Sequence, residues 1–303
     1  MSQSAEDLAT LAEDADLDQP LKRVAYEPGM LLGVEATRDE QQYHRRRLTR
    51  HQYWLHGAGT LAGMAVNVDA PTGTDPTKDT TVRLLVDPGV GIDGLGREVT
   101  IGERYCINLG DWIAAQDRTG LEDAFYVLPD STDGVPSLNL RVMVRYSDCP
   151  TALQPVLAWE LNAGTDAVQS SRIADSIVLE LLTAPLHAPE TVYRPWAAHP
   201  AIAEDVSARL TDAEQKHLGA SPSAVDQLRA RLVYGLGPEA NTDLPGDLAE
   251  IARILLASLS IAAPATDSTL DDIVVNPAHI HLNNLVRPFV VTPGQLEHLS
   301  APA

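Results

Sequence analysis

After residue 57, short apolar segments alternate with turns rich in glycine and proline, and this pattern constrains the fold more than any other feature. The apolar runs at 60–68 and 82–86 have strand length, and turn residues bound each of them. Asp93-Gly94, followed by Gly96, is typical of a tight hairpin reversal. We therefore predict a compact, largely antiparallel β domain over residues 60–148.

Periodicity extends this prediction along the chain. Apolar residues alternate over 138–146, which predicts a half-buried strand. Helical patterns follow residue 200, and the clearest stripe consists of Leu248, Ile251, Leu255 and Leu259. The remaining predictions are a short helix at 108–115, a strand at 177–182, helices at 202–218, 223–234 and 247–260, and extended segments at 273–275 and 285–291. Because these last segments end the chain, they could return to pair with the β domain.

A helix is predicted at about residues 38–55, before the β domain. Thr37 and Glu40 have the spacing of a capping box, in which the two side chains satisfy free backbone N–H groups. Several arginines lie toward the expected C-terminal end of the helix, where their positive charge complements the helix dipole. Gly57 is predicted to end the helix. These arginines could form an anion-binding or protein-contact surface, or simply pair with the carboxylates of an acidic protein.

Together these patterns predict an α+β fold. An N-terminal capped helix and a largely antiparallel β domain precede a mostly helical C-terminal region. The expected organisation is an acidic disordered tail at 1–20, a helix-plus-β domain at 21–148, a loop-rich connection at 149–200 and a mainly helical region with terminal extended segments at 201–303.

Charge and composition limit the possible partners. The chain has 303 residues and a formal net charge of −20, which opposes general binding to nucleic acid or anionic lipid. No apolar run is long enough to span a bilayer, and no export signal is recognisable. The two cysteines, Cys106 and Cys149, are expected to be buried free thiols. A reducing cytoplasm is the expected compartment of assembly.

Motifs of catalysis are absent from the sequence. It contains no HExxH zinc motif, no GxSxG nucleophile elbow and no phosphate-binding glycine loop. The histidine groups are His44, His51 and His56, and the pair His279 and His281, for which Asp271 or Asp272 would be further ligands. Adjacent acids also occur at Glu122-Asp123. We predict no enzyme, no catalytic residue, no cofactor and no metal site.

Three stretches, taken in order, carry a family resemblance. They are YEPGMLLGVEATRDEQQYHRRRLTRHQYWLHGAGTLAGMAV, then VDPGVGIDGLGREVTI, and then VRYSDCPTALQPV with SSRIADSIVLEL. Over residues 24–182 the chain resembles an uncharacterised family of proteins encoded with contractile injection systems, the phage-tail-like particles of bacteria and archaea. It departs from that family in having no cysteine after Cys149.

The resemblance implies a structural or accessory subunit near the baseplate or tail end of such a particle, acting through protein–protein contacts. The particle would be released or attached at the cell envelope, and a homo-oligomer is left open. The expected contact residues are Tyr43, Arg46, Arg47, Arg50, Trp54 and His56. The expected turn residues are Gly57, Gly89, Asp93, Gly94 and Gly96. Two alternatives are a metal-dependent hydrolase or toxin cargo using His279 and His281, and a surface- or glycan-binding fibre module.

Overall fold

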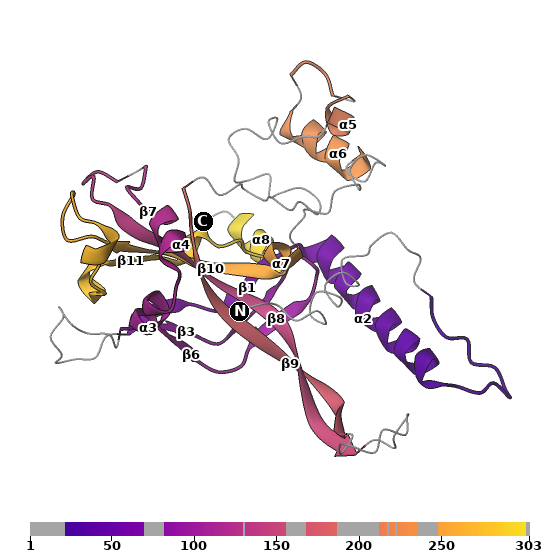
Figure 1. Cartoon of the computed structure of the whole chain (residues 1–303). Helices are drawn as coiled ribbons and strands as arrows, with labels where there is room; N and C mark the ends of the chain where they lie inside the picture. The colour runs from indigo at the N-terminus through magenta and orange to yellow at the C-terminus, as the bar shows by residue number, and fades with distance from the viewer. Residues whose placement is uncertain are drawn as a thin grey trace.

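The fold is known from a computed structural model that describes residues 22–69, 82–129, 131–155, 168–186, 212–216, 218–221, 223–234 and 248–300 (Figure 1). It combines helices with antiparallel sheets, which confirms the α+β class. The acidic tail predicted at 1–20 and most of the helix predicted at 202–218 lie outside the described residues.

Three sheets form the body of the protein. One has the order β1-β4-β5, the second has the order β2-β3-β6, and in the third β8 lies between β10 on one side and β7 and β9 on the other, with β11 beyond β10. Their bounds are β1 Gly59–Gly63, β2 Val66–Asp69, β3 Arg83–Val86, β4 Gly89–Ile92, β5 Glu98–Ile101, β6 Tyr105–Asn108, β7 Phe125–Tyr126, β8 Ser137–Pro155, β9 Val168–Thr183, β10 Arg253–Ala262 and β11 Ile280–Asn283.

Several helices precede or connect strands along the chain. The long helix α2 precedes β1, while two short helices connect β6 to β7, and α7 leads directly into β10. Their bounds are α2 Val34–His56, α3 Leu109–Ala114, α4 Arg118–Asp123, α5 Asp212–Gln215, α6 Ala224–Tyr234, α7 Leu248–Ile251 and α8 Pro293–Ser300, with 3-10 turns η3 Leu270–Asp272, η4 Pro277–His279 and η5 Asn284–Val286.

A single hydrophobic core joins the sheets. The alternation predicted in β8 is confirmed, because Leu138, Leu140, Val142 and Val144 are all buried in it. On the neighbouring strand, β10 contributes Ile254, Leu256, Leu259 and Ile261. The smaller sheets add Val66, Leu84, Val86, Val99 and Ile101, and Met64, between β1 and β2, is buried in the same core. Aliphatic side chains from strands far apart in sequence therefore hold the fold together.

The structure corrects several local predictions. The expected strand 60–68 is two strands, since Met64 has a positive φ of 57° that interrupts the extended backbone. The expected helix 247–260 is wrong beyond α7, because the segment forms β10, which pairs with β8 from Arg253↔Arg145 to Ala262↔Ser137. Residues 149–200, expected to be loop-rich, contain the outer part of β8 and all of β9.

Both cysteines are exposed, so their predicted burial is also wrong. Cys106 lies on β6, which pairs with β3 and is at the edge of its sheet among the described strands, while Cys149 lies far out on β8. The alternation of side chains along a strand places some residues away from the core, and a lone cysteine carries no signal of which side it takes.

The C-terminal segment returns to the β domain, as the sequence left open. β11 pairs with β10, and Asn284 brackets β2 by accepting from the Val66 N–H and donating to the Val66 carbonyl, each at 2.9 Å. The buried Arg287 donates to the carbonyls of Gly63 and Met64, at 3.3 and 2.9 Å. This guanidinium therefore satisfies the carbonyls exposed where β1 breaks into β2, and burial lowers its pKa.

β8 and β9 continue beyond the rest of their sheet. β10 pairs with β8 only as far as Arg145, whereas the β8–β9 pairing runs on to Pro155↔Val168. The outer half is therefore a two-stranded ribbon, visible in Figure 1 as an arm that projects from the body. A free two-stranded ribbon is at best marginally stable in water, so the arm depends on contacts at its base.

Candidate protein-contact site

Helix α2 projects from the body of the protein (Figure 1). It has 23 residues, or about 34 Å at 1.5 Å per residue, and it begins three residues before the predicted capping box. That capping box is wrong: the N-cap is Gly33, the Thr37 hydroxyl donates back to the Gly33 carbonyl at 3.3 Å, and Glu40 lies inside the helix. Gly57 ends the helix with a φ of 74°, which favours glycine.

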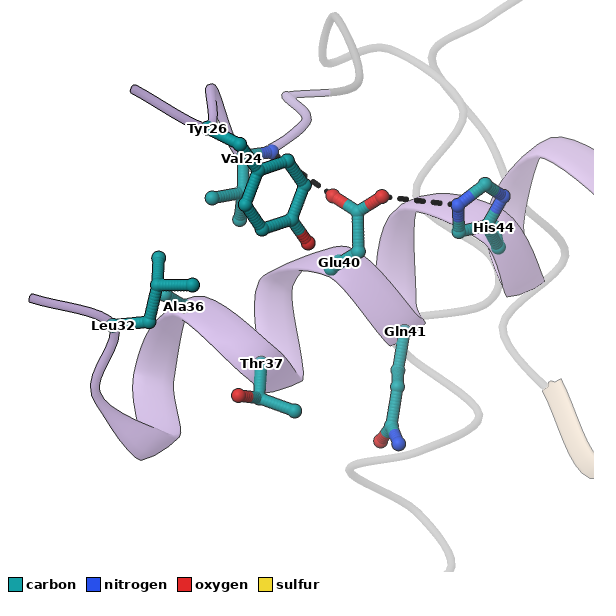
Figure 2. Close-up of a pocket in the computed structure, with 8 residues that line it drawn as sticks. All are labelled: Val24, Tyr26, Leu32, Ala36, Thr37, Glu40, Gln41 and His44. Carbon is teal, nitrogen blue, oxygen red and sulfur yellow. Dashed lines mark hydrogen bonds and ion pairs between the residues drawn. The ribbon is translucent and has the colours of Figure 1, made fainter. Parts of the chain in front are cut away.

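The segment before α2 folds back along its first half (Figure 2). The Glu40 carboxylate accepts from the Val24 N–H at 3.1 Å and contacts His44 Nε2 at 3.0 Å. Between segment and helix lies a small cavity of about 160 Å³, lined by Val24, Tyr26, Leu32, Ala36, Thr37, Glu40, Gln41 and His44. Glu40, which the sequence predicted as a helix cap, therefore holds the preceding segment against α2.

This segment and the first residue of α2 expose an unusual run of large apolar side chains. Met30, Leu31, Leu32 and Val34 are all exposed, and Leu31 is 98% exposed. A run of apolar side chains this long is unfavourable in contact with water. Such a run indicates a contact surface, because a partner that covers it removes the side chains from water.

The second half of α2 is anchored on the turn between β4 and β5. Thr49 and Tyr53 are buried there, and a Cβ added to Gly96 would clash with the Thr49 carbonyl and lie 3.0 Å from the Tyr53 Cβ. On the other side of the same turn, the Gly94 N–H donates to the Ile251 carbonyl at 3.0 Å. Glycine at 94 and 96 thus lets the turn lie between α2 and α7.

Gly89 has a similar reason for lacking a side chain. A Cβ there would clash with the backbone of Ala62 and Met64, where β1 ends and the chain turns into β2. Gly57, in contrast, has open space around it, and its requirement is the positive φ at the end of α2.

A buried ion pair closes the β4–β5 turn. Asp93 Oδ1 accepts from the N–H groups of Leu95 and Arg97, each at 2.9 Å, and Oδ2 accepts from Arg97 Nε at 2.7 Å. Asp93 is fully buried, and burial raises the pKa of its carboxyl, although Arg97 and the two N–H groups act in the opposite direction. The predicted reversal is confirmed, and the Asp93 carboxylate accepts three hydrogen bonds within it.

From Arg97 the network continues to the base of the arm. The guanidinium lies over the Tyr146 ring, 5.1 Å from its centroid, and the Tyr146 hydroxyl is 2.7 Å from both Asp148 and Asp175. These two acids face each other across β8 and β9. A hydroxyl has one hydrogen and donates to one carboxylate at a time, and burial together with these carboxylates raises the pKa of Tyr146.

Helix α2 reaches the same network through Arg45, whose Nη1 lies 4.0 Å from Asp148 Oδ2. The turn, the helix and the arm therefore meet in one set of charged and polar groups, from Asp93 through Tyr146 to Arg45. Like charges directly across a sheet repel, and the arginine and the hydroxyl offset that repulsion. The sequence does not mark Arg45, Tyr146, Asp148 or Asp175 as site residues, because no local pattern indicates which strand lies beside a residue.

The predicted contact residues are distributed around α2. Tyr43 and Arg47 share one face, where the Arg47 guanidinium donates to the Tyr43 hydroxyl at 3.0 Å. Arg46 and Arg50 are half-buried, and the Trp54 side chain lies outside the described part of the structure. His56 is exposed with its ring edge against His51, at 5.9 Å between centroids. These residues all belong to α2, but they point in different directions around the helix.

The two candidate acidic metal ligands, Asp271 and Asp272, have other partners. Asp271 forms an ion pair with Arg118, which also binds Glu122 at 3.0 Å, and Asp272 caps η3 through the Thr269 N–H and hydroxyl. His281 is exposed on β11. Across the described ranges, no group of three or more His, Cys, Asp or Glu residues could hold a metal ion.

Comparison with known proteins adds no relative. No protein-family model matches the chain, and no curated protein is significantly similar to it. Within the residues that the structure describes, no helix is long and apolar enough to cross a membrane.

Proposed function

We propose that this chain is a structural or accessory subunit of a larger protein assembly, and that it acts through protein–protein contacts made by α2 and the segment before it. The observation that carries the proposal is the projecting helix, which begins beside four exposed apolar side chains, Met30, Leu31, Leu32 and Val34. An apolar surface with an arginine-rich border has the composition of a binding surface.

The assembly we propose is a contractile injection particle, with the subunit near its baseplate or tail end. The support is the set of three sequence stretches described above, two of which now have a structural meaning. YEPGMLLGVEATRDE forms the exposed segment and the start of α2, and VDPGVGIDGLGREVTI forms the hairpin that anchors the helix. Such a subunit would assemble in the cytoplasm, in a particle that is then released or held at the cell envelope.

The test is incorporation of a charge-reversed subunit. In the native host, Arg46→Glu together with Arg50→Glu should abolish co-purification with the particle, while circular dichroism shows a folded protein. The matched control is Arg83→Glu with Arg229→Glu, which changes net charge equally at exposed positions on β3 and α6. Normal incorporation of the first variant, or absence of any particle in a pull-down of the wild-type protein, contradicts the proposal.

A further inference from the structure

β9 is a long strand with one unpaired edge. It pairs with β8 from Leu140↔Thr183 to Pro155↔Val168, and it pairs with no other strand in the part of the chain that the structure describes. Its 16 residues far exceed the common strand length of about 5 to 6. Alternate residues of an edge strand direct their backbone N–H and C=O groups away from the sheet, where they can bond to a further strand. The free edge of β9 is therefore a template for strand addition, and it runs along the projecting arm (Figure 1).

The two edges of the arm differ in how they resist such pairing. Along β8, Pro150 and Pro155 each lack a backbone N–H, and Ala152 has a positive φ of 54° that interrupts the extended backbone. β9 contains neither proline nor lysine, which commonly block an exposed edge, and none of its residues has a positive φ. Its one basic residue, Arg172, donates to the Ser171 carbonyl at 2.8 Å. Pairing through β9 is therefore open, whereas pairing through the outer part of β8 is obstructed.

The arm carries little of the charge of the chain. Its charged side chains are two acids and one arginine, so it contributes −1 to a net charge of −20. They are Asp148, Asp175 and Arg172, within 146–155 and 168–177. Two apolar side chains, Leu153 and Ile173, are 71% and 67% exposed there. A nearly uncharged, partly apolar edge suits another strand of the same character, and salt screens the repulsion between whole chains because their charges lie mainly outside the arm.

We propose that the β9 edge pairs antiparallel with the β9 edge of a second copy of this chain, about a two-fold axis. The result is a four-stranded sheet in the order β8-β9-β9-β8, which removes the free β9 edge of both copies. Sheets of three or more strands with an apolar face reach independent stability, whereas each two-stranded arm alone is marginal. The second copy thus supplies the strands that the arm lacks, and the contact closes as a dimer because both copies use the same surface.

Charge selects the register of this pairing. About a two-fold axis perpendicular to the sheet, one residue lies opposite its own copy, and two registers pair the most residues of β9. The first centres on Asp175 and sets two carboxylates directly opposite each other, which is unfavourable. The second centres on Ser176, pairs 169–183 with the same range of the second copy, and places Arg172 opposite Glu180 of the second copy. Glu180 also binds two arginines of its own chain, so avoidance of the Asp175 pair decides the register.

Sedimentation velocity of the purified full chain over a concentration series tests for the dimer. The wild type should dimerise, and more tightly in about 1 M than in about 0.1 M NaCl, since the screening length falls from about 10 Å to about 3 Å and the repulsion between acidic chains weakens. Ser176→Glu and Ser176→Lys each set like charges opposite each other on the axis, so each should weaken dimerisation by about tenfold or more. Ser131→Glu, at an exposed position outside the arm, is the matched control and should dimerise as the wild type does.

Mixing the two Ser176 variants is the decisive step, because a heterodimer sets opposite charges against each other on the axis. Once circular dichroism has verified that each variant is folded, the mixture should associate more tightly than either variant alone. A wild type that stays monomeric, Ser176 variants that dimerise as the wild type does, or a mixture no tighter than its parts overturns the inference. Arg46→Glu with Arg50→Glu should leave the dimer intact, since α2 takes no part in it, so this inference and the proposed function fail separately.

Discussion

Arg97 links two parts of the fold that are far apart in sequence: its Nε donates to Asp93 within the β4–β5 turn, while its guanidinium covers the ring of Tyr146 on β8. Asp93 is fully buried, and Arg97 is nearly so. Because the same turn lies against Thr49 and Tyr53, one ion pair orders the turn, supports α2 and reaches the base of the arm.

Removing the acid of this pair should destabilise the whole protein. Asp93→Ala leaves the Arg97 guanidinium buried without its carboxylate, and we expect a loss of about 3 to 5 kcal/mol in the free energy of unfolding, measured by urea denaturation. The control is Asp69→Ala, which breaks an exposed ion pair with Arg83 and should cost less than about 1 kcal/mol. Equal losses in the two variants would show that burial of the Asp93 pair contributes nothing.

The turn glycine should be as sensitive as the acid. Gly96→Ala introduces a side chain against the Thr49 carbonyl at a φ of 79°, so we expect a loss of about 2 kcal/mol or more and faster hydrogen exchange in the second half of α2. Gly102→Ala is the matched control, since nothing lies within 4 Å of its added Cβ. Unchanged exchange in α2 would mean that the helix does not depend on this contact.

Tyr146 should give the protein a distinct response to alkaline pH. Its folded-state pKa is raised above the ordinary value of 10.0, so folding favours the protonated hydroxyl. The stabilisation is fully present below pH 10.0 and is lost as pH rises above it, because the unfolded chain releases the proton first. Tyr146→Phe should therefore flatten the fall in unfolding free energy between about pH 9 and 11, measured by urea denaturation. An unchanged slope in this variant would contradict the role of the Tyr146 hydroxyl.

The exposed segment before α2 should affect assembly without affecting stability. Leu31→Ser removes an apolar side chain that is almost entirely in solvent, so the unfolding free energy should change by less than about 0.5 kcal/mol. If the segment makes the proposed contacts, incorporation into the particle should fall. Leu186→Ser, at another exposed leucine, serves as the control. A Leu31 variant that is incorporated at the wild-type level would remove this segment from the proposed interface.

Local signals predicted elements whose reasons are local. The α2 helix, the Asp93–Gly96 reversal and the buried face of β8 depend on spacing over a few residues, and all three are confirmed. β10 was predicted as a helix because Leu248, Ile251, Leu255 and Leu259 fit a helical stripe. In the structure this segment lies beside β8 in the middle of a sheet, where Ile254, Leu256, Leu259 and Ile261 are buried. Short apolar runs fit either period, and the neighbouring strand decides between them.

The sequence by itself determined that the chain is an acidic α+β protein with a basic helix before a glycine-rich β domain, because composition, charge and turn chemistry act within a few residues of chain. Only the tertiary structure decided that Arg97 covers Tyr146, that Glu40 holds the preceding segment instead of capping the helix, and that Asn284 and Arg287 close the break between β1 and β2. These contacts join residues that are up to 224 positions apart. No local preference encodes such pairs, since burial in a common core is what brings them together.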